Sequence, residues 1–182
     1  MKFYIIVIFS ALLVSCTKYS LLKDYRQLKS ESISIPQFEH VVNNGRDSVL
    51  HEDFKKAKLK FIVLCDSTNC NKCFIESIYG WQDITKLADS LQNQLSIYFI
   101  FCPRKSDINE IHNSLLKAKF QYPTILDQEG AFQTYNPHIP QNELLHYFLI
   151  DEEGTVIMIG NPISNIQTNN LFKKTVEEYL KR

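Results

Sequence analysis

The chain has 182 residues, a length that predicts one domain of ordinary size. Its hydrophobic fraction of 45%, with 12 Phe and 9 Tyr, excludes a disordered tail and predicts a substantial core. Basic and acidic side chains number 20 each, so no excess of positive charge favours nucleic acid as a partner.

The first 15 residues have the pattern of an export signal. Lys2 gives a positive start, residues 3–14 form a short apolar run, and Ser15 stands before a cysteine. The run is too short to span a bilayer as a permanent helix, which takes about 20 residues. Lys2 is the only charged residue before Cys16, so cleavage there would leave 19 basic and 20 acidic side chains, a formal charge of −1.

Residues 13–16, Leu-Val-Ser-Cys, resemble the lipobox of bacterial lipoproteins at every position. The resemblance implies cleavage before Cys16 and attachment of lipid, such as palmitate, to its thiol and new amino group. Several acyl chains anchor a protein stably, whereas one chain binds only marginally. The alternatives are an ordinary signal peptide with an incidental cysteine, or a short membrane anchor. The implied product is a lipid-anchored protein of the bacterial cell envelope that faces the periplasm, with inner membrane, outer membrane and cell surface left open.

Two segments follow the lipobox cysteine. Residues 16–57 are polar and weakly patterned, and we interpret them as a lipid-anchored tether that leads into a domain at 58–182. A short strand is expected near 48–51. From residue 59, apolar runs typical of buried strands alternate with amphipathic helical patterns. We expect further strands near 60–65, 96–102, 123–127, 147–150 and 155–159, and helices over 74–91, from 107 onward, and over 169–180.

This order of elements predicts an α/β fold. Strands alternating with helices indicate a parallel core, and a turn at residues 151–154 adds an antiparallel hairpin before the last helix. The expected architecture is a central mixed sheet with flanking helices and a C-terminal β-hairpin plus helix. That arrangement resembles the thioredoxin-like fold.

Cys70 and Cys73 form a Cys-x-x-Cys pair at a predicted strand-to-helix junction. A cysteine at a helix N-terminus lies near unpaired N–H groups and the positive end of the helix dipole, both of which favour the nucleophilic thiolate. Two intervening residues place the second sulfur about one helical turn away, where it can close a disulfide. We therefore predict that Cys70 attacks a substrate disulfide and that Cys73 resolves the mixed disulfide. Lys72 adds a positive charge beside the pair.

Other uses of the pair stay open. A Cys-x-x-Cys is also half of many zinc sites, but the chain has no second one, and its five histidines lack a matching spacing, so we predict no metal. A structural disulfide that does not turn over is compatible with an exported chain. Nothing indicates a nucleotide, haem or flavin, so no cofactor is expected.

The domain resembles the TlpA-like, membrane-tethered thiol-disulfide oxidoreductases of bacterial envelopes, a branch of the thioredoxin superfamily close to the AhpC/TSA group. The match covers residues 58–182 and rests on the strand before the cysteine pair, the pair itself, residues 122–127, and the Phe-Leu-Ile-Asp…Gly stretch at 148–156. Glu76 matches a family glutamate three residues after the second cysteine, which tunes its proton chemistry. The resemblance implies Cys70, Cys73 and Glu76 as catalytic residues.

The same resemblance implies protein disulfides as substrates and a redox partner that this chain does not supply. Many relatives reduce disulfides in the envelope, for example in cytochrome c maturation. The chain departs from the family at Asn69, where Trp is usual, and at Leu145, where a cis-proline faces the disulfide and helps to bind substrate chains. His146 belongs to the same loop and could face the sulfurs, or could be a satisfied loop histidine.

These departures leave two other functions open. One is a non-catalytic thioredoxin-fold binding lipoprotein in which the cysteine pair is a structural staple. The other is a peroxiredoxin-like peroxidase. Ser67 precedes Cys70 by three residues, as a peroxidase requires, but Val63 occupies the position of its proline. The required arginine has no clear candidate, and Arg104 is only a guess.

Cys65 and Cys102 end two strands that should be neighbours in this fold. A disulfide between them requires Cα atoms within about 7 Å and suitably directed side chains. Neighbours across a parallel pair often lack that geometry, so we expect two buried thiols that behave as small hydrophobic residues.

Overall fold

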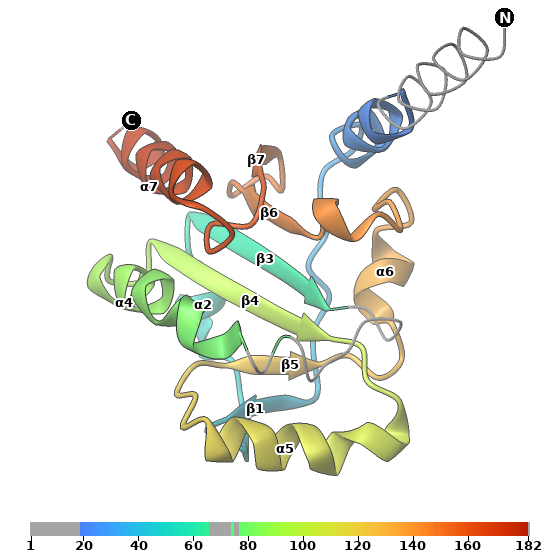
Figure 1. The fold of residues 1–182 in the computed structure, drawn as a ribbon, viewed down its shortest axis with the longest axis vertical. Coiled ribbons are helices and arrows are strands. Elements are labelled where there is room, and N and C mark those ends of the chain that lie inside the picture. Colours follow the sequence, from blue (N-terminus) through green and yellow to red (C-terminus); the bar gives the residue numbers. More distant parts are fainter. Residues whose placement is uncertain (1–18, 66–73, 75–76, 182) are drawn as a thin grey trace, which may run out of the picture.

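The structure, a computed structural model, describes residues 19–65, 74 and 77–181. Its centre is a seven-stranded sheet with the order β2-β1-β5-β4-β3-β6-β7 (Figure 1). The strands are β1 (Val41–Asn43), β2 (Arg46–Ser48), β3 (Leu59–Cys65), β4 (Leu95–Phe101), β5 (Thr124–Leu126), β6 (Tyr147–Ile150) and β7 (Val156–Ile159).

Helices connect and cover these strands. Residues 19–28 form what we call the N-terminal helix. Among the described residues, no helix is both long enough and apolar enough to cross a membrane. The other α-helices are α2 (Glu52–Lys55), α4 (Gln82–Ser90), α5 (Ile108–Lys117), α6 (Ala131–Tyr135) and α7 (Ile166–Leu180), and the 3-10 helices are η1 (Ile78–Trp81), η2 (Lys105–Asp107) and η3 (Glu143–Leu145).

β3 and β4 form the centre of the sheet. They pair in parallel over their whole length, from Leu59 opposite Leu95 to Cys65 opposite Phe101. β4 also pairs in parallel with β5, whereas β6 runs antiparallel to β3 and β7 antiparallel to β6. All residues of these two central strands except Lys60 are buried, which explains their near-continuous apolar sequences.

The alternation of side chains along the central strands divides the core into two clusters. Phe61, Val63 and Cys65 of β3 contribute to the first cluster, together with residues of α4, α5 and α7. Ile62 and Leu64 contribute to the second, together with Phe132 of α6 and residues near the N-terminus. In Figure 1, α4 and α7 lie at the left of the view and α6 lies at the right.

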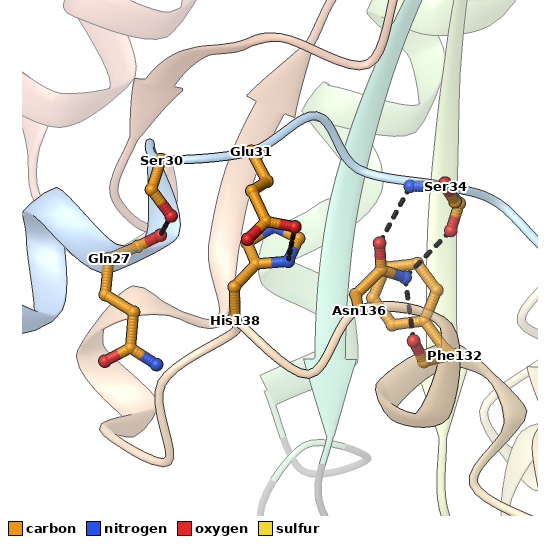
Figure 2. Close-up of polar contacts among 7 residues, drawn as sticks. All are labelled: Gln27, Ser30, Glu31, Ser34, Phe132, Asn136 and His138. Atoms are coloured by element: carbon orange, nitrogen blue, oxygen red, sulfur yellow. Dashed lines mark hydrogen bonds and ion pairs between the residues drawn. The ribbon is translucent and has the colours of Figure 1, made fainter.

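Residues 29–36, which we call the strap, join the N-terminal helix to the second face of the sheet. Asn136 holds the strap by two hydrogen bonds: its Oδ1 accepts from the Ser34 N–H at 2.7 Å, and its Nδ2 donates to the Ser34 carbonyl at 2.8 Å (Figure 2). The Ile33 N–H donates to the Gly154 carbonyl at 2.8 Å, and the side chain of Ile33 is buried. Figure 2 also shows Glu31 beside the buried His138, with Oε2 3.9 Å from Nδ1.

The predicted fold class is confirmed, and the strands expected at 60–65, 96–102, 123–127, 147–150 and 155–159 lie within one residue of those limits at every end. The strand expected near 48–51 was wrong, because β2 ends at Ser48 and α2 begins at Glu52. The last helix begins at Ile166 rather than 169, where Asn165 Oδ1 accepts from the Thr168 N–H. Leu116 of α5 and Leu171 of α7 are exposed.

The helix expected over 74–91 is described only in part. Around Gly80 the chain forms the 3-10 helix η1, and α4 continues from Gln82. Such 3-10 turns are frequent at the ends of α-helices, and the glycine lowers the helix propensity at this point. The strands β1 and β2 and the helix α6 were not predicted, since elements of three to five residues are too short to show a period.

Candidate functional site

The residues predicted to carry the chemistry, Cys70, Cys73 and Glu76, and the predicted lipid acceptor Cys16, lie outside the described residues. The structure does describe what flanks the cysteine pair in the chain. Cys65 ends β3 five residues before Cys70, and Phe74 follows Cys73 directly. The candidate site is therefore the carboxyl end of β3 and the elements around it.

A pocket of about 530 Å³ lies at this end of β3. Leu64 and Cys65 of β3 line it, as do Phe74 and Ser77 on the helical side. The rest of its wall comes from η3, the start of β6, the loop after β7 and α7, as Glu143, Leu144, Tyr147, Gly160, Asn161, Ser164 and Thr168. Mixed apolar and hydrogen-bonding walls suit an extended polypeptide segment as well as a small ligand.

Stacked aromatic rings fix the wall of the pocket at Phe74. Phe74 packs against Phe101 with ring centroids 4.9 Å apart and stacks on Trp81 at 6.1 Å. Trp81 in turn stacks on Tyr147 at 6.2 Å with an interplanar angle of 11°. Such ring pairs add to the stabilisation from burial alone. Position 74, directly after Cys73, is thus anchored in the core.

Burial governs the titration of the groups that line the pocket. Burial raises the pKa of the Cys65 thiol strongly, and the neighbouring Cys102 raises it further. Burial also raises the pKa of Tyr147 to about 12, with smaller contributions from Cys65 and Glu143. Both groups stay protonated and neutral near pH 7, so neither supplies a thiolate or phenolate nucleophile there.

The loop at residues 140–146 contains Leu145, the position at which the resemblance noted from the sequence implies a cis-proline. The described residues contain no cis peptide bond, and the loop instead forms η3. Asn142 caps this turn, since its Oδ1 accepts from the Leu144 N–H at 3.2 Å and its backbone carbonyl accepts from the Leu145 N–H at 2.9 Å. Leu145 is buried in the second core cluster. This loop is closed by its own hydrogen bonds rather than by a cis-proline.

His146 is a satisfied loop histidine. Its ring is buried, and Nε2 lies 2.9 Å from the Pro140 carbonyl oxygen within the same loop. The His146 carbonyl accepts from the Leu64 N–H at 2.9 Å, which extends the pairing between β6 and β3 to the edge of the pocket. Of the two roles considered from the sequence, the structure supports the structural one.

Cys65 and Cys102 are buried thiols, as expected, and no disulfide joins them. Cys65 belongs to the first core cluster and Cys102 to the second, so their side chains point to opposite faces of the sheet. Arg104, considered for a peroxidase, has an exposed side chain, and its Nε lies 3.2 Å from Asp107 Oδ2. Within the part of the chain described, no cluster of His, Cys, Asp or Glu could hold a metal ion.

Sequence reasoning missed the walls of the pocket that come from η3 and the β7–α7 loop. Glu143, Leu144 and Asn161 lie 70 or more residues after Cys73, and only the tertiary fold brings this part of the chain to β3. One local signal was present, since Asn142 is a residue type that favours caps and turns. The loops that build the pocket carry no other sequence signature.

Comparisons with solved structures agree with this architecture. A thioredoxin-like protein from Porphyromonas gingivalis superposes with a TM-score of 0.51 at 16% identity, covering 82% of this chain and 94% of its own. A Chlorobium tepidum protein assigned as thiol:disulfide interchange protein DsbE gives 0.53 at 10% identity, covering 81% and 96%. Thioredoxin from Wuchereria bancrofti gives 0.51 at 10% identity, covering 79% and 99%.

No protein-family model matches the sequence, and no curated protein matches it. The likeness to solved structures is one of fold, because the identities are far below those at which function is shared. The topology, with parallel β3 and β4 and antiparallel β6 and β7, and these superpositions lead to the same conclusion. The chain has the thioredoxin-like fold, the fold type of thiol-disulfide oxidoreductases.

Proposed function

We propose that this chain is a lipid-anchored thiol-disulfide oxidoreductase of the bacterial envelope that reduces or exchanges protein disulfides. The observation that carries the proposal is the pocket of about 530 Å³ at the carboxyl end of β3. In the sequence, the Cys-x-x-Cys pair falls between Cys65 and Phe74, two residues that line this pocket. A substrate segment in this pocket would therefore lie beside the part of the chain that carries the pair.

Cys70 is the attacking residue in this proposal. Its thiolate attacks one sulfur of a substrate disulfide, forms a mixed disulfide and releases the other substrate sulfur as a thiolate. The thiolate of Cys73 then attacks Cys70 Sγ and releases the second substrate sulfur. The substrate gains two electrons and the pair becomes a disulfide, which an external dithiol partner must reduce again. Glu76 would take up and return the proton of Cys73.

The location follows from the first residues of the chain. Residues 1–15 act as the export signal, and Cys16 carries lipid that holds the domain on the membrane. The domain faces the periplasm in this proposal. An oxidising compartment supplies protein disulfides as substrates.

A second function is favoured by the loop at 140–146. Because η3 replaces the cis-proline turn and buries Leu145, the surface that usually receives a substrate chain differs here. A binding lipoprotein whose cysteine pair is a stable disulfide would need no such turn. We therefore keep a non-catalytic binding module as the alternative.

Trapping of mixed disulfides tests the proposal. Cys73→Ser should accumulate a mixed disulfide through Cys70 when the reduced protein meets a disulfide-bonded substrate, because the resolving thiol is gone. Cys70→Ser is the matched control and should trap far less. Equal trapping by both variants would reverse or remove the assigned roles, and no trapping by either would favour the binding module.

A further inference from the structure

The N-terminal helix exposes a group of large apolar side chains. The exposed fractions are 75% for Tyr19, 49% for Leu22, 41% for Tyr25 and 40% for Leu21. A single exposed apolar residue is ordinary on a protein surface. Three of these residues, Tyr19, Leu22 and Tyr25, fall within an arc of about 120° around the helix and form the kind of patch that marks an interaction surface.

Basic residues accompany this apolar group. Lys23, Arg26 and Lys29 are all exposed, and Lys29 Nζ lies 5.6 Å from the centre of the Tyr25 ring. At about 100° per residue, Arg26 and Lys29 fall on the same side of the helix as Leu22 and Tyr25. We call residues 19, 22, 23, 25, 26 and 29 the basic-aromatic face; Leu21 lies outside it, about 20° from the buried Leu28 around the helix.

The opposite side of the helix is occupied by the domain. Asp24 Oδ2 accepts from Asn142 Nδ2 at 3.4 Å, and Leu28 is fully buried in the second core cluster. Asp24 is the only acidic residue between Tyr19 and Lys29, and it is directed toward the domain. The face left to solvent therefore carries apolar side chains, and all of its charged side chains are basic.

The length of the helix limits what it can do at a membrane. Its ten residues, 19–28, span about 15 Å, which is half of a hydrocarbon core of about 30 Å. A short helix with tyrosine and leucine between basic residues instead suits the interface, where apolar groups enter the headgroup region and lysine and arginine meet anionic lipids.

We propose that the basic-aromatic face lies on the surface of an anionic phospholipid membrane. This inference rests on the proposed lipid at Cys16, which precedes Tyr19 by three residues and would hold the helix within about 10 Å of the bilayer. Lipid chains and the helix would then form two separate attachments. Two attachments restrict rotation about the anchor, which one alone does not.

A second copy of the chain is the competing occupant. A two-fold interface would place the same face against itself, and so would bring Lys23, Arg26 and Lys29 near their own counterparts. Repulsion among these six charges would oppose such a dimer. Anionic headgroups are the complementary surface.

The proposal has a consequence for the redox site. Asn142, which receives the N-terminal helix through Asp24, also caps η3, and η3 carries Glu143 and Leu144 of the pocket. The strap adds a second connection through Ser34 and Asn136 (Figure 2). A membrane-bound helix would therefore hold the pocket in one orientation to the membrane.

Fluorescence quenching in vesicles tests the inference. The mature lipidated protein with Leu22→Trp is reconstituted in phosphatidylglycerol vesicles whose acyl chains carry bromine, and emission is corrected for the buried Trp81 with the unsubstituted protein. Ser20→Trp is the matched control, since Ser20 is exposed about 160° away on the same helix. We expect the tryptophan at 22 to be quenched at least about twofold more than the one at 20.

Charge removal provides the second arm. Replacing Lys23, Arg26 and Lys29 by Ser in the Leu22→Trp protein should abolish that difference, because each basic residue raises affinity for an anionic surface about fivefold. Phosphatidylcholine vesicles should have the same effect. Vesicle sedimentation reports the lipid anchor, and a soluble disulfide substrate reports redox activity independently.

The outcomes are distinct. Sedimentation with equal quenching at both positions overturns the role of the helix and leaves the anchor intact. Failure to sediment overturns the anchor and the helix together, whatever the redox activity. A dimer in solution that dissociates when the apolar Leu22 of the face is replaced by Ser would assign the face to a second copy instead of a membrane.

Discussion

The backbone N–H of Cys102 donates a 3.0 Å hydrogen bond to the carbonyl of Cys65, yet the two side chains belong to opposite faces of the sheet. The bond extends the parallel pairing of β3 and β4 by one residue, because Cys65 itself lies opposite Phe101. Successive residues of a strand point to opposite faces, so Cys102 points away from the face that Cys65 occupies. The two thiols therefore lie on opposite faces of the sheet, although the backbones of the two residues are hydrogen-bonded.

We expect neither thiol to react in the folded protein. Both thiols are buried, burial keeps Cys65 protonated, and the thiolate is the species that attacks an alkylating reagent. Alkylation of the reduced protein with iodoacetamide at pH 7, mapped by mass spectrometry, should label Cys70 and leave Cys65 and Cys102 unmodified. Alkylation in guanidinium should label all of them. A Cys65–Cys102 disulfide formed by mild oxidation of the folded protein would contradict the placement on opposite faces.

Gly154 and Gly130 offer a matched test of the strap. Both have positive φ, +81° and +64°, so alanine strains the backbone at either position. A Cβ at Gly154 would also lie 2.4 Å from the Ile33 carbonyl oxygen, whereas a Cβ at Gly130 meets nothing within 4 Å. Urea denaturation should show that Gly130→Ala lowers the free energy of unfolding by about 1 kcal/mol and Gly154→Ala by about 2 kcal/mol more. Equal losses would mean that the strap does not pack on Gly154.

Leu145→Pro tests why the loop departs from the family. Proline removes the Leu145 N–H that donates to the Asn142 carbonyl at 2.9 Å, and it also loses the buried leucine side chain. Leu145→Ala loses the side chain but keeps the donor. Leu145→Pro should therefore be less stable than Leu145→Ala by about 1–3 kcal/mol in urea denaturation. A proline variant as stable as the alanine variant, with faster disulfide reduction, would show that this loop accepts the turn of the family.

The centre of the fold was predictable because burial on both faces leaves a direct trace in the sequence. β3, β4 and β6 read as apolar runs for that reason, and the turn at residues 151–154 is set by local chemistry, since Asp151 Oδ1 accepts from the Glu153 and Thr155 N–H groups. Asn136 shows what could not be predicted from the sequence. Asn136 is a buried polar residue whose hydrogen-bond partner, Ser34, lies 102 residues away in the sequence. No local sequence pattern predicts such a pair.

The candidate site likewise has one part that the sequence predicts and one part that only the tertiary structure reveals. The cysteine pair is recognisable from its spacing and its place after a buried strand, and this information is local. The pocket beside it is assembled from β3, η3, β6 and α7, whose contributions depend on tertiary packing. Tyr147 illustrates this, since its sequence position predicts a strand residue, but its stacking on Trp81 makes it part of the pocket wall.

The reduction potential of the Cys70–Cys73 pair in the mature protein tests the central claim most directly. Equilibration with glutathione buffers, read by alkylation and mass spectrometry, gives the value. We predict a potential between about −120 and −270 mV, the range of working oxidoreductases, with a Cys70 pKa below about 8.5. A potential below about −300 mV, with Cys70 unreactive when reduced, would identify a structural disulfide and contradict the proposed catalysis.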